Sequence, residues 1–328
     1  MRIGVHVRHW QGSPHDVAEL ARIAEGGGLD SIWVSETWGS DAVALAAWIA
    51  AATTTIGVGT GILQMAGRTP AQTAMAALTL DHLSGGRFRL GLGVSGPQVV
   101  EGWHGVAFDE PLARTREYVA IVRAILRRDD VLTAPGPHYP LPRPEGVGKS
   151  LKANVRTLRP DLPVYLAALG PRNVALAAEI ADGWLPLLFS PDHPDAFPSD
   201  GFPDGFDVAP MVLTAVGDDL DAARDDVRPQ IALYVGAFGS RSSNFYADLV
   251  RRYGFDAQVD AIQAAALDGR MGDATAAVPD ELVDAVALVG PASRARERLG
   301  AYADAGATTV LAMTIDASTV ASLAEVAA

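Results

Sequence analysis

Short apolar runs alternate with amphipathic stretches along the whole chain. Buried parallel strands are nearly continuous in apolar residues, whereas the helices that cover them repeat about every 3.6 residues. Eight apolar runs predict strands, at 3–7, 31–34, 56–63, 88–94, 164–168, 183–187, 208–216 and 309–313. Helical patterns lie between them, at about 14–25, 41–52, 70–83, 111–128 and 171–180, with more after Asp218 and after Pro291.

Eight strand-helix units predict a closed (β/α)8 TIM barrel rather than an open sheet. A doubly wound sheet would carry a glycine-rich phosphate fingerprint after the first strand, and residues 8–12 read Arg-His-Trp-Gln-Gly instead. We therefore predict one barrel domain over residues 1–328. Insertions are expected at about 129–161, 189–206 and 228–290, of which the first two are rich in Pro and Gly and the third is mostly helical in pattern.

Composition narrows the class of protein. The chain has 328 residues, a formal net charge of -13 and a pI near 4.9, so repulsion disfavours nucleic acid or an anionic membrane as partner. There is no cysteine, which excludes disulfides, thiolate nucleophiles and cysteine-bound metals, and we predict no metal site. The first residues enter a strand directly, without a signal-peptide pattern, so a cytoplasmic location is expected.

The junction after the fifth predicted strand has the features of an anion site. Gly170 and Pro171 follow the strand, and a helix carrying Arg172 and Asn173 begins there. Proline at the first helical position costs no hydrogen bond, and the free N–H groups of a first turn attract anions. A phosphate-bearing ligand is therefore expected at this helix.

Glycines occur where the third and fourth strands end, in the segments Thr60–Gln64 and Gly91–Gly96. A strand-end glycine lets a flat ligand approach the backbone, although it can equally relieve crowding at a bulge. Together with the later helix, these glycines predict a planar ring at the barrel mouth with its phosphate at Gly170.

The chain resembles the luciferase-like flavin and deazaflavin oxidoreductases, and within them the methylenetetrahydromethanopterin-reductase-like branch that uses coenzyme F420. No single motif is diagnostic, but their order and spacing together are specific. The residues that carry the resemblance are Ser31–Glu36, Thr60–Ile62, Leu83–Phe88, Gly91–Gly96 with Glu101–Gly105, and Tyr165–Trp184.

This resemblance implies a bacterial luciferase-like barrel with the deazaflavin lying across the carboxyl ends of the strands. Thr60, Gly61 and Ile62 would lie at the ring, with a cis peptide bond between Gly61 and Ile62 as its backstop. Other binding residues would be Gly93, Val94, Ser95 and Gly96 along the ring or its ribityl chain, and Leu169, Gly170, Pro171, Arg172 and Asn173 around the phosphate. Leu169 would contribute packing, and Arg172 would add charge or lie solvated.

Two residues are candidates for catalysis. Glu36 ends the second strand, where relatives often place an acid near the ring, and its alternative role is to cap the following turn. His6 lies in the first strand and could relay a proton near neutral pH, or could be a buried structural histidine.

The predicted function is F420-dependent hydride transfer to or from a small organic substrate. Alternatives are an FMN-dependent monooxygenase of the same superfamily and a noncatalytic flavin-binding relative.

A cation cluster, Arg143, Lys149, Lys152, Arg156 and Arg159, could attract an anionic cofactor tail or simply be solvated. An aromatic substrate wall could include Trp10, Trp38, Trp103, Phe245 and Tyr246, although packing at the barrel rim explains these residues equally well. The Ala-rich helices 41–52 and 70–83 favour a homodimer.

Overall fold

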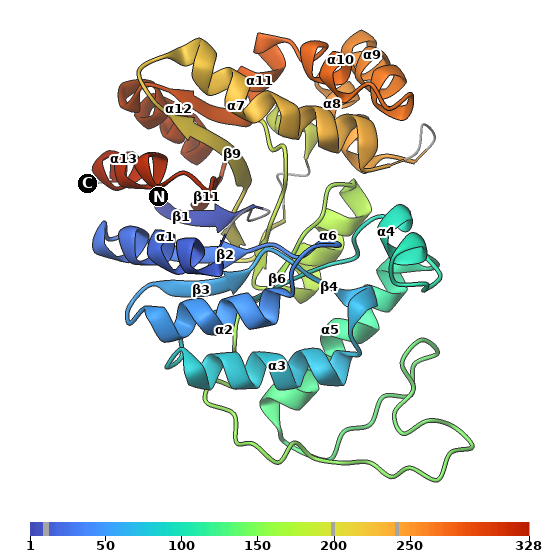
Figure 1. Ribbon diagram of the computed structural model, residues 1–328. Coiled ribbons are helices and arrows are strands. Elements are labelled where there is room, and N and C mark those ends of the chain that lie inside the picture. The colour runs from blue at the N-terminus through green and yellow to red at the C-terminus, as the bar shows by residue number, and fades with distance from the viewer. Residues whose placement is uncertain (9–12, 198–200, 240–242, 328) are drawn as a thin grey trace.

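Helices surround a barrel of parallel strands in the computed structural model, which describes residues 1–8, 13–197, 201–239 and 243–327 (Figure 1). The strands are β1 (Arg2–Val7), β2 (Ser31–Val34), β3 (Gly57–Thr60), β4 (Leu63–Gln64), β5 (Phe88–Gly93), β6 (Val164–Leu166), β7 (Gly183–Trp184), β8 (Asp207–Val208), β9 (Met211–Val216), β10 (Ala287–Gly290) and β11 (Thr309–Met313). All of their pairings are parallel, as the apolar pattern predicts.

Helices α1 to α6 belong to the first five strand-helix units, and α7 to α13 follow β9. The bounds of the first group are α1 (Pro14–Gly26), α2 (Ala42–Ala52), η1 (Met65–Gly67), α3 (Pro70–Leu83), α4 (Pro97–Gly102), α5 (Pro111–Arg127), α6 (Pro171–Ile180) and η2 (Pro194–Ala196). Those of the second are α7 (Leu220–Ala232), the π-helical turn η3 (Leu233–Ala237), α8 (Phe245–Arg252), α9 (Asp256–Leu267), α10 (Met271–Ala276), α11 (Asp280–Val286), α12 (Ala292–Asp304) and α13 (Ala317–Ala327).

The segment that contains β8 and β9 closes the barrel. The strand order is β10-β9-β11-β1-β2-β3-β5-β6-β7-β8. Asp207 and Val208 pair with β7, whereas Met211 to Leu213 pair with β11, so one stretch of chain joins both edges. The N–H of Met211 also donates to the carbonyl of Pro186 at 2.8 Å across this join. The predicted eight-stranded barrel is therefore confirmed.

One strand was not predicted. Residues 228–290 were expected to be helical, but β10 pairs with β9 outside the closed barrel. Helix α11 runs directly into β10, and the apolar pattern of residues 282–290 does not distinguish the two because both elements are buried there. The predicted insertion is mostly helical, as expected, and β10 is the strand that the prediction did not include.

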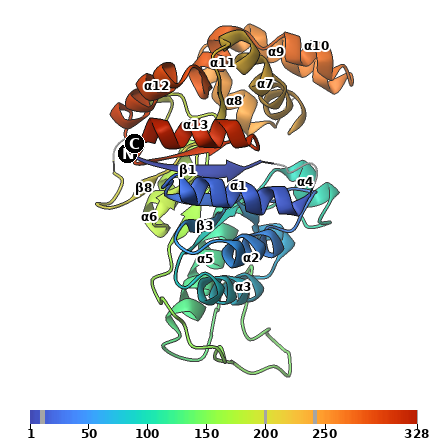
Figure 2. The ribbon, with the colours of Figure 1, turned by 60° about the vertical axis from the view of Figure 1, so that its left-hand side comes forward.

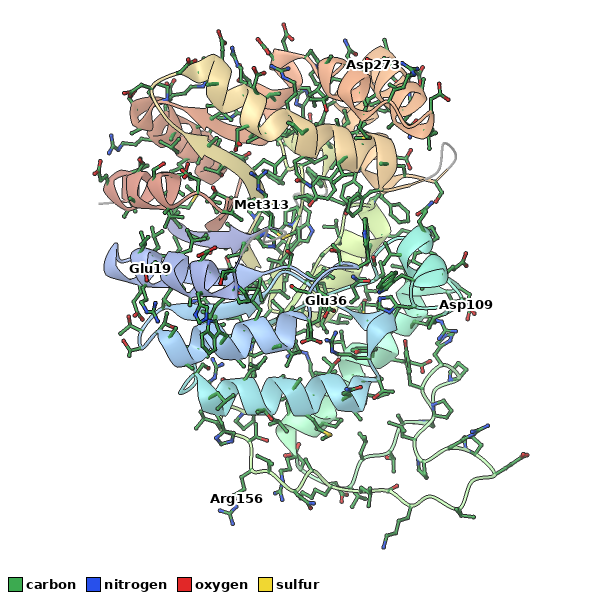
Figure 3. The ribbon with its side chains drawn as sticks, in the orientation of Figure 1. Glu19, Glu36, Asp109, Arg156, Asp273 and Met313 are labelled. Atoms are coloured by element: carbon green, nitrogen blue, oxygen red, sulfur yellow. The ribbon has the colours of Figure 1, made fainter. Side chains whose placement is uncertain are left out.

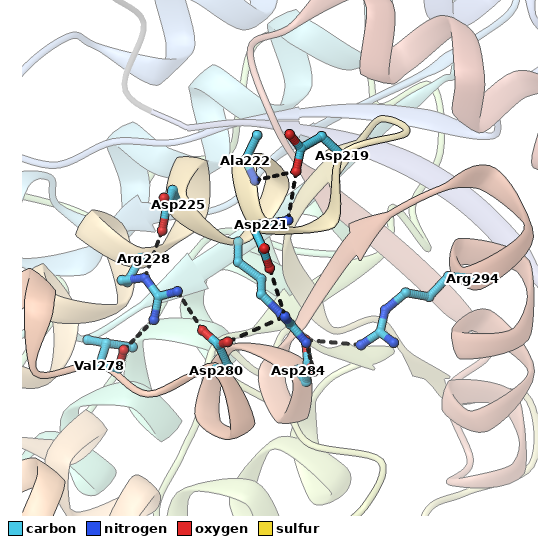
Figure 4. Close-up of polar contacts among 10 residues, drawn as sticks. Asp219, Asp221, Ala222, Asp225, Arg228, Val278, Asp280, Asp284 and Arg294 are labelled. Atoms are coloured by element: carbon cyan, nitrogen blue, oxygen red, sulfur yellow. Dashed lines mark hydrogen bonds and ion pairs between the residues drawn. The ribbon is translucent and has the colours of Figure 1, made fainter.

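Ion pairs fix α11 against α7. Arg224 pairs with Asp284 at 2.6 Å, and Arg228 pairs with Asp280 at 2.6 Å (Figure 4). The segment from α7 to α11 lies at one side of the barrel, where Figure 2 shows it above α13 and β1. Its helices are thereby held as a unit next to the carboxyl end of β9.

Helices α1, α2 and α3 begin at capping residues that the sequence marks as helix starts. Ser13 and Asp16 form a capping box at α1, and Asp41 accepts from the Ala44 N–H at 2.8 Å at α2. Thr69 caps α3, with Pro70 as its first residue. The caps of α2 and α3 begin helices a few residues after β2 and β4, so the residues between these strands and helices lie at one end of the barrel.

The first predicted insertion, 129–161, extends along α3 and α5 as an irregular segment (Figure 1). Its cations lie away from the carboxyl ends of the strands. Arg159 donates to the carboxylate of Asp81 and to the carbonyl of Phe88, the first residue of β5, and Figure 3 shows Arg156 at the bottom of the view, below α3. The cation cluster therefore lies apart from the barrel mouth. The second insertion, 189–206, packs aromatic residues on Trp184, including Phe197 at 5.2 Å and Phe202 at 5.7 Å between ring centroids.

Candidate active site

A cavity of about 400 Å³ opens at the carboxyl ends of the barrel strands. This volume is in the range typical of small-molecule sites, about 300–1,000 Å³. Figure 3 shows Glu36 and Met313, two of its lining residues, near the middle of the molecule. Each barrel strand, or the one or two residues that follow it, contributes to the lining; in strand order these residues are His6, Glu36, Gly61, Gly93, Ala168, Leu185, Met211 and Met313.

The cavity collects the residues that the sequence predicts for the site, with one exception. His6, Glu36, Gly61, Ile62, Gly93–Gly96 and Leu169–Asn173 all line it. Thr60 does not line it, because its side chain is fully buried between strands. Its hydroxyl donates to the Gly91 carbonyl at 2.9 Å and accepts from the Gly91 N–H at 3.0 Å. Thr60 therefore joins β3 to β5, and its predicted contact with a ligand is not supported.

The floor of the cavity is the peptide between Gly61 and Ile62, which is cis, as the resemblance implied. The His6 ring lies against it, and His6 is 2% exposed. A Cβ on Gly61 would lie 2.7 Å from this ring, so only glycine fits here. His6 Nε2 lies 2.6 Å from the Gly61 carbonyl oxygen, and because a carbonyl only accepts, Nε2 carries the proton.

The helix start at Gly170 offers fewer free donors than the sequence predicts. The N–H of Asn173 already donates to the Gly170 carbonyl at 2.9 Å, and Pro171 has none. In the described part of the chain, no protein acceptor faces the N–H groups of Gly170 and Arg172. The expectation that Asn173 supplies a backbone donor was therefore wrong, because the first helical turn satisfies it. The Arg172 side chain is exposed beside the cavity.

These donors and the glycines suit an anionic, flat ligand. Gly170 and Gly96 present no Cβ to the cavity, and a Cβ on Gly93 would lie 2.9 Å from the Ile62 side chain. A phosphate fits the pair of free N–H groups at the start of α6, with Arg172 beside it. The residues present thus fit a flavin-like cofactor.

Comparisons with known proteins agree with this geometry. The sequence profile described as "Luciferase-like monooxygenase" matches residues 1–309. The chain belongs to the luciferase-like monooxygenase family. Rv3520c of Mycobacterium tuberculosis, provisionally named a coenzyme F420-dependent oxidoreductase, is 43% identical over 324 residues, which cover 94% of this chain and 93% of that protein.

Two further relatives represent the reductase branch of the luciferase-like family. The 5,10-methylenetetrahydromethanopterin reductase of Methanolobus tindarius is 28% identical over 90% of this chain and 89% of its own length. The structure of the coenzyme F420-dependent tetrahydromethanopterin reductase from Methanopyrus kandleri superposes with a TM-score of 0.84 at 22% identity, covering 99% of this chain and 98% of that one. The second similarity confirms the barrel fold.

Glu36 of this luciferase-like chain serves mainly to anchor backbone. Its carboxylate accepts from the Gln64 N–H at 3.0 Å, from Arg68 at 2.7 Å and from the Ala42 N–H at 3.4 Å. Burial acts to lower the pKa of Arg68, but its bond to Glu36 and the charges of Glu36 and Asp41 raise that pKa above its usual value. The carboxylate is thus paired with a cation, and it also accepts from the N–H at the start of α2, where Asp41 is the N-cap.

Several lining residues of this luciferase-like cavity were missed by the sequence analysis. Arg8, just after β1, lines it, as do Tyr234 and Phe238 from the η3 region. The position of Arg8 at a strand end was the available signal, because strand ends build barrel active sites. No sequence signal marks Tyr234 and Phe238, since a helical pattern does not reveal which turn faces a distant strand.

The structure places two of the five residues of the predicted aromatic wall at the cavity. Phe245 and Tyr246 line the cavity. Trp38 lies behind Phe238, with 5.3 Å between ring centroids, whereas Trp103 is 64% exposed and does not line the cavity. Trp10 lies outside the described residues.

Proposed function

We propose that this cavity carries out direct hydride transfer between coenzyme F420 and a small organic substrate. The chain is an F420-dependent oxidoreductase of the luciferase-like family, as its 43% identity to Rv3520c and its similarity to the methanopterin reductases support. The observation that carries the proposal is one cavity that joins the Gly61–Ile62 floor to the free N–H groups at Gly170 and Arg172.

When bound, F420 supplies the hydride chemistry, so the task of the protein is to bind and orient the two reactants. Gly96 presents no side chain to a flat ring, Gly93 leaves room for the Ile62 side chain, and Gly170 with Arg172 would hold an anion. His6 fixes the Gly61 carbonyl through its Nε2 proton, which keeps the floor in place. Met211 and Met313 contribute apolar surface that excludes water from the reacting atoms.

We further propose roles for the two catalytic candidates. His6 is a residue of the floor, and its ring holds a proton at Nε2 that could be exchanged only if the bond to Gly61 opens. Glu36 is a positioning residue, because its carboxylate binds backbone and Arg68. A His6→Asn variant tests the first role: a change in the pH profile of turnover, beyond a lower rate, supports proton transfer by His6.

Titration of the purified chain with F420 and with FMN tests the cofactor. We expect fluorescence titration to give at least tenfold tighter binding of F420, and substrate turnover to consume F420 in equal amounts. The family description names monooxygenases, so an FMN enzyme is the second candidate. Tight FMN binding without F420 binding would establish it, and F420 binding without turnover of any substrate would favour a noncatalytic relative.

A homodimer stays a prediction, and the surface supports it. Helices α2 and α3 expose Trp48 at 44%, Met75 at 63% and Leu83 at 58%, which are large apolar side chains on neighbouring helices. A solution mass equal to the 34.3 kDa chain would contradict the dimer.

Within the described residues, no helix is long and apolar enough to cross a membrane. The cytoplasmic location also stays a prediction.

A further inference from the structure

Arg8 brings a second cation to the cavity, apart from the helix start at Gly170. Its side chain is 16% exposed and lines the cavity. It pairs with Asp226 of α7 at 3.5 Å, and that carboxylate is 55% exposed. This distance is long for a charge-assisted hydrogen bond, which is about 2.7–2.9 Å. Because a guanidinium has five N–H donors, Arg8 keeps donors for a ligand.

Next to Arg8, an aromatic cluster forms one wall of the cavity. The cluster consists of Tyr234, Phe238 and Tyr246, whose ring centroids lie 4.9 Å apart for Tyr234 and Phe238 and 5.0 Å for Tyr234 and Tyr246. Burial raises the pKa of Tyr234 to about 12, although the nearby charge of Arg8 acts to lower it. The wall is thus apolar and uncharged at neutral pH, with one cation beside it.

The aromatic cluster is held in place by Asn244, which is 3% exposed. Its amide nitrogen donates to the carbonyls of Tyr234 at 3.2 Å and Val235 at 2.8 Å, in the π-helical turn. Its amide oxygen accepts from the N–H groups of Tyr246 and Ala247 at the start of α8, each at 3.0 Å. One side chain therefore joins η3 to α8 and sets the rings that both carry.

The two cationic ends of the cavity lie on opposite sides of the barrel. Arg8 follows β1 and Gly170 follows β6. Strands β2, β3 and β5 separate β1 from β6 on one side, and β7, the β8–β9 segment and β11 separate them on the other. A ligand whose phosphate lies at Gly170 and whose ring lies on the Gly61–Ile62 floor therefore leaves the Arg8 side for a second ligand.

Charge indicates the chemistry of that second ligand. Among the residues that the structure describes, those that line the cavity with an Arg, Lys, Asp or Glu side chain are Arg8, Glu36 and Arg172, and Glu36 is already paired with Arg68. A largely buried cation is stabilised by an anionic partner, and the Asp226 carboxylate is distant and solvated. The remaining neighbours are aromatic rings and the thioethers of Met211 and Met313, which favour an apolar body.

We infer that the space between Arg8 and the aromatic cluster binds the substrate, and that this substrate is an apolar ring compound bearing one carboxylate or similar acidic oxygen. The inference rests on the proposed function, since the second ligand is taken to be the hydride partner of F420. The acidic oxygen pairs with Arg8, and the ring packs on Tyr234 and Phe238.

Calorimetric titration of the full chain with 2-naphthoate and with its neutral analogue 2-naphthamide tests this inference without turnover. We expect naphthoate to bind at least about tenfold tighter than naphthamide, as a charge-assisted bond to a buried guanidinium implies. Arg8→Gln should remove this preference by weakening naphthoate alone, and Arg8→Lys should restore part of it. Phe238→Leu should weaken both probes to the same extent.

The matched control is Arg22→Gln, which removes the same charge at a surface ion pair with Glu19 and should leave both affinities unchanged. Equal binding of the two probes, no naphthoate binding at millimolar concentration, or unchanged naphthoate affinity in Arg8→Gln would overturn the inference. The same holds if Arg8→Gln weakens F420 more than naphthoate, because Arg8 would then belong to the cofactor site. If the wild-type chain binds naphthoate but not F420, only the proposed function is refuted.

Discussion

The two ends of the barrel use polar residues in opposite ways. At the amino end, Asp207 is 5% exposed and forms an ion pair with Arg2 at 2.8 Å. It also accepts hydrogen bonds from the hydroxyls of Tyr165, Thr308 and Thr309, at 2.9, 2.5 and 2.8 Å. At the carboxyl end, the N–H groups of Gly170 and Arg172 face a cavity, and Arg8 has only a loose ion pair there.

This difference separates stability from function within one barrel. Polar groups that are satisfied by protein partners hold strand ends together, whereas donors left without close partners are available to a ligand. Changes at the amino end should therefore alter the free energy of unfolding, and changes at the carboxyl end should alter affinity. Four variants test this division, in order of decreasing expected effect.

Asp207→Ala should have the largest effect on stability. It leaves Arg2, Tyr165 and two threonine hydroxyls without their shared acceptor. Removing one partner of a buried charged network costs about 3–5 kcal/mol of unfolding free energy, which urea denaturation measures. The control Asp204→Ala changes an exposed loop carboxylate and should have little effect. A loss below about 1 kcal/mol would show that the network does not stabilise the barrel.

Asn244→Ala challenges the division, because this residue at the carboxyl end has a structural role. Its four hydrogen bonds join η3 to α8, so we expect a loss of about 1–3 kcal/mol in unfolding free energy. The affinity for 2-naphthoate should fall as well, since the aromatic cluster loosens. Asn154→Ala, at an exposed position, is the control. Lower stability with unchanged naphthoate affinity would show that the hydrogen bonds of Asn244 do not set the positions of the rings in the aromatic cluster.

Arg172→Gln should reduce F420 affinity about threefold to tenfold, because one exposed charge near a phosphate contributes modestly. The free energy of unfolding should change by less than about 0.5 kcal/mol, as for most surface substitutions. The affinity loss should shrink at high salt, where exposed charges are screened. A solvated Arg172 without a role in binding would leave F420 affinity unchanged at every salt concentration.

Glu25→Gln is expected to have the smallest effect, and it tests one carboxylate at the amino end. Burial acts to raise the pKa of Glu25, but bonds from the Thr55, Ile56 and Thr54 N–H groups and the Thr55 hydroxyl lower it from 4.5 to about 2. Because the folded-state pKa is lowered, its stabilisation is complete above pH 4.5 and is lost as pH falls toward about 2. The stability difference between wild type and Glu25→Gln should shrink over this range, and a difference independent of pH would contradict the assignment.

Much of the fold could be predicted because its signals are local. Apolar runs mark buried strands, and Ser13, Asp41 and Thr69 mark helix starts. The glycines at strand ends placed Gly61, Gly93 and Gly170 at the barrel mouth, where the cavity contains them. The errors were also local in cause: β10 continues an apolar helix, and the Asn173 N–H is satisfied within its own turn.

The sequence by itself determined the barrel, the end at which its cavity lies and the helix start at Gly170, because strand polarity, glycine positions and helix starts are properties of short segments. Only the tertiary structure decided that Arg8 meets Tyr234 and Phe238, which follow it by more than 220 residues. This proximity depends on the position of α7, whose Asp226 pairs with Arg8, and on the hydrogen bonds by which Asn244 holds η3. Helical periodicity indicates which face of a helix is buried, but it does not indicate against which strand.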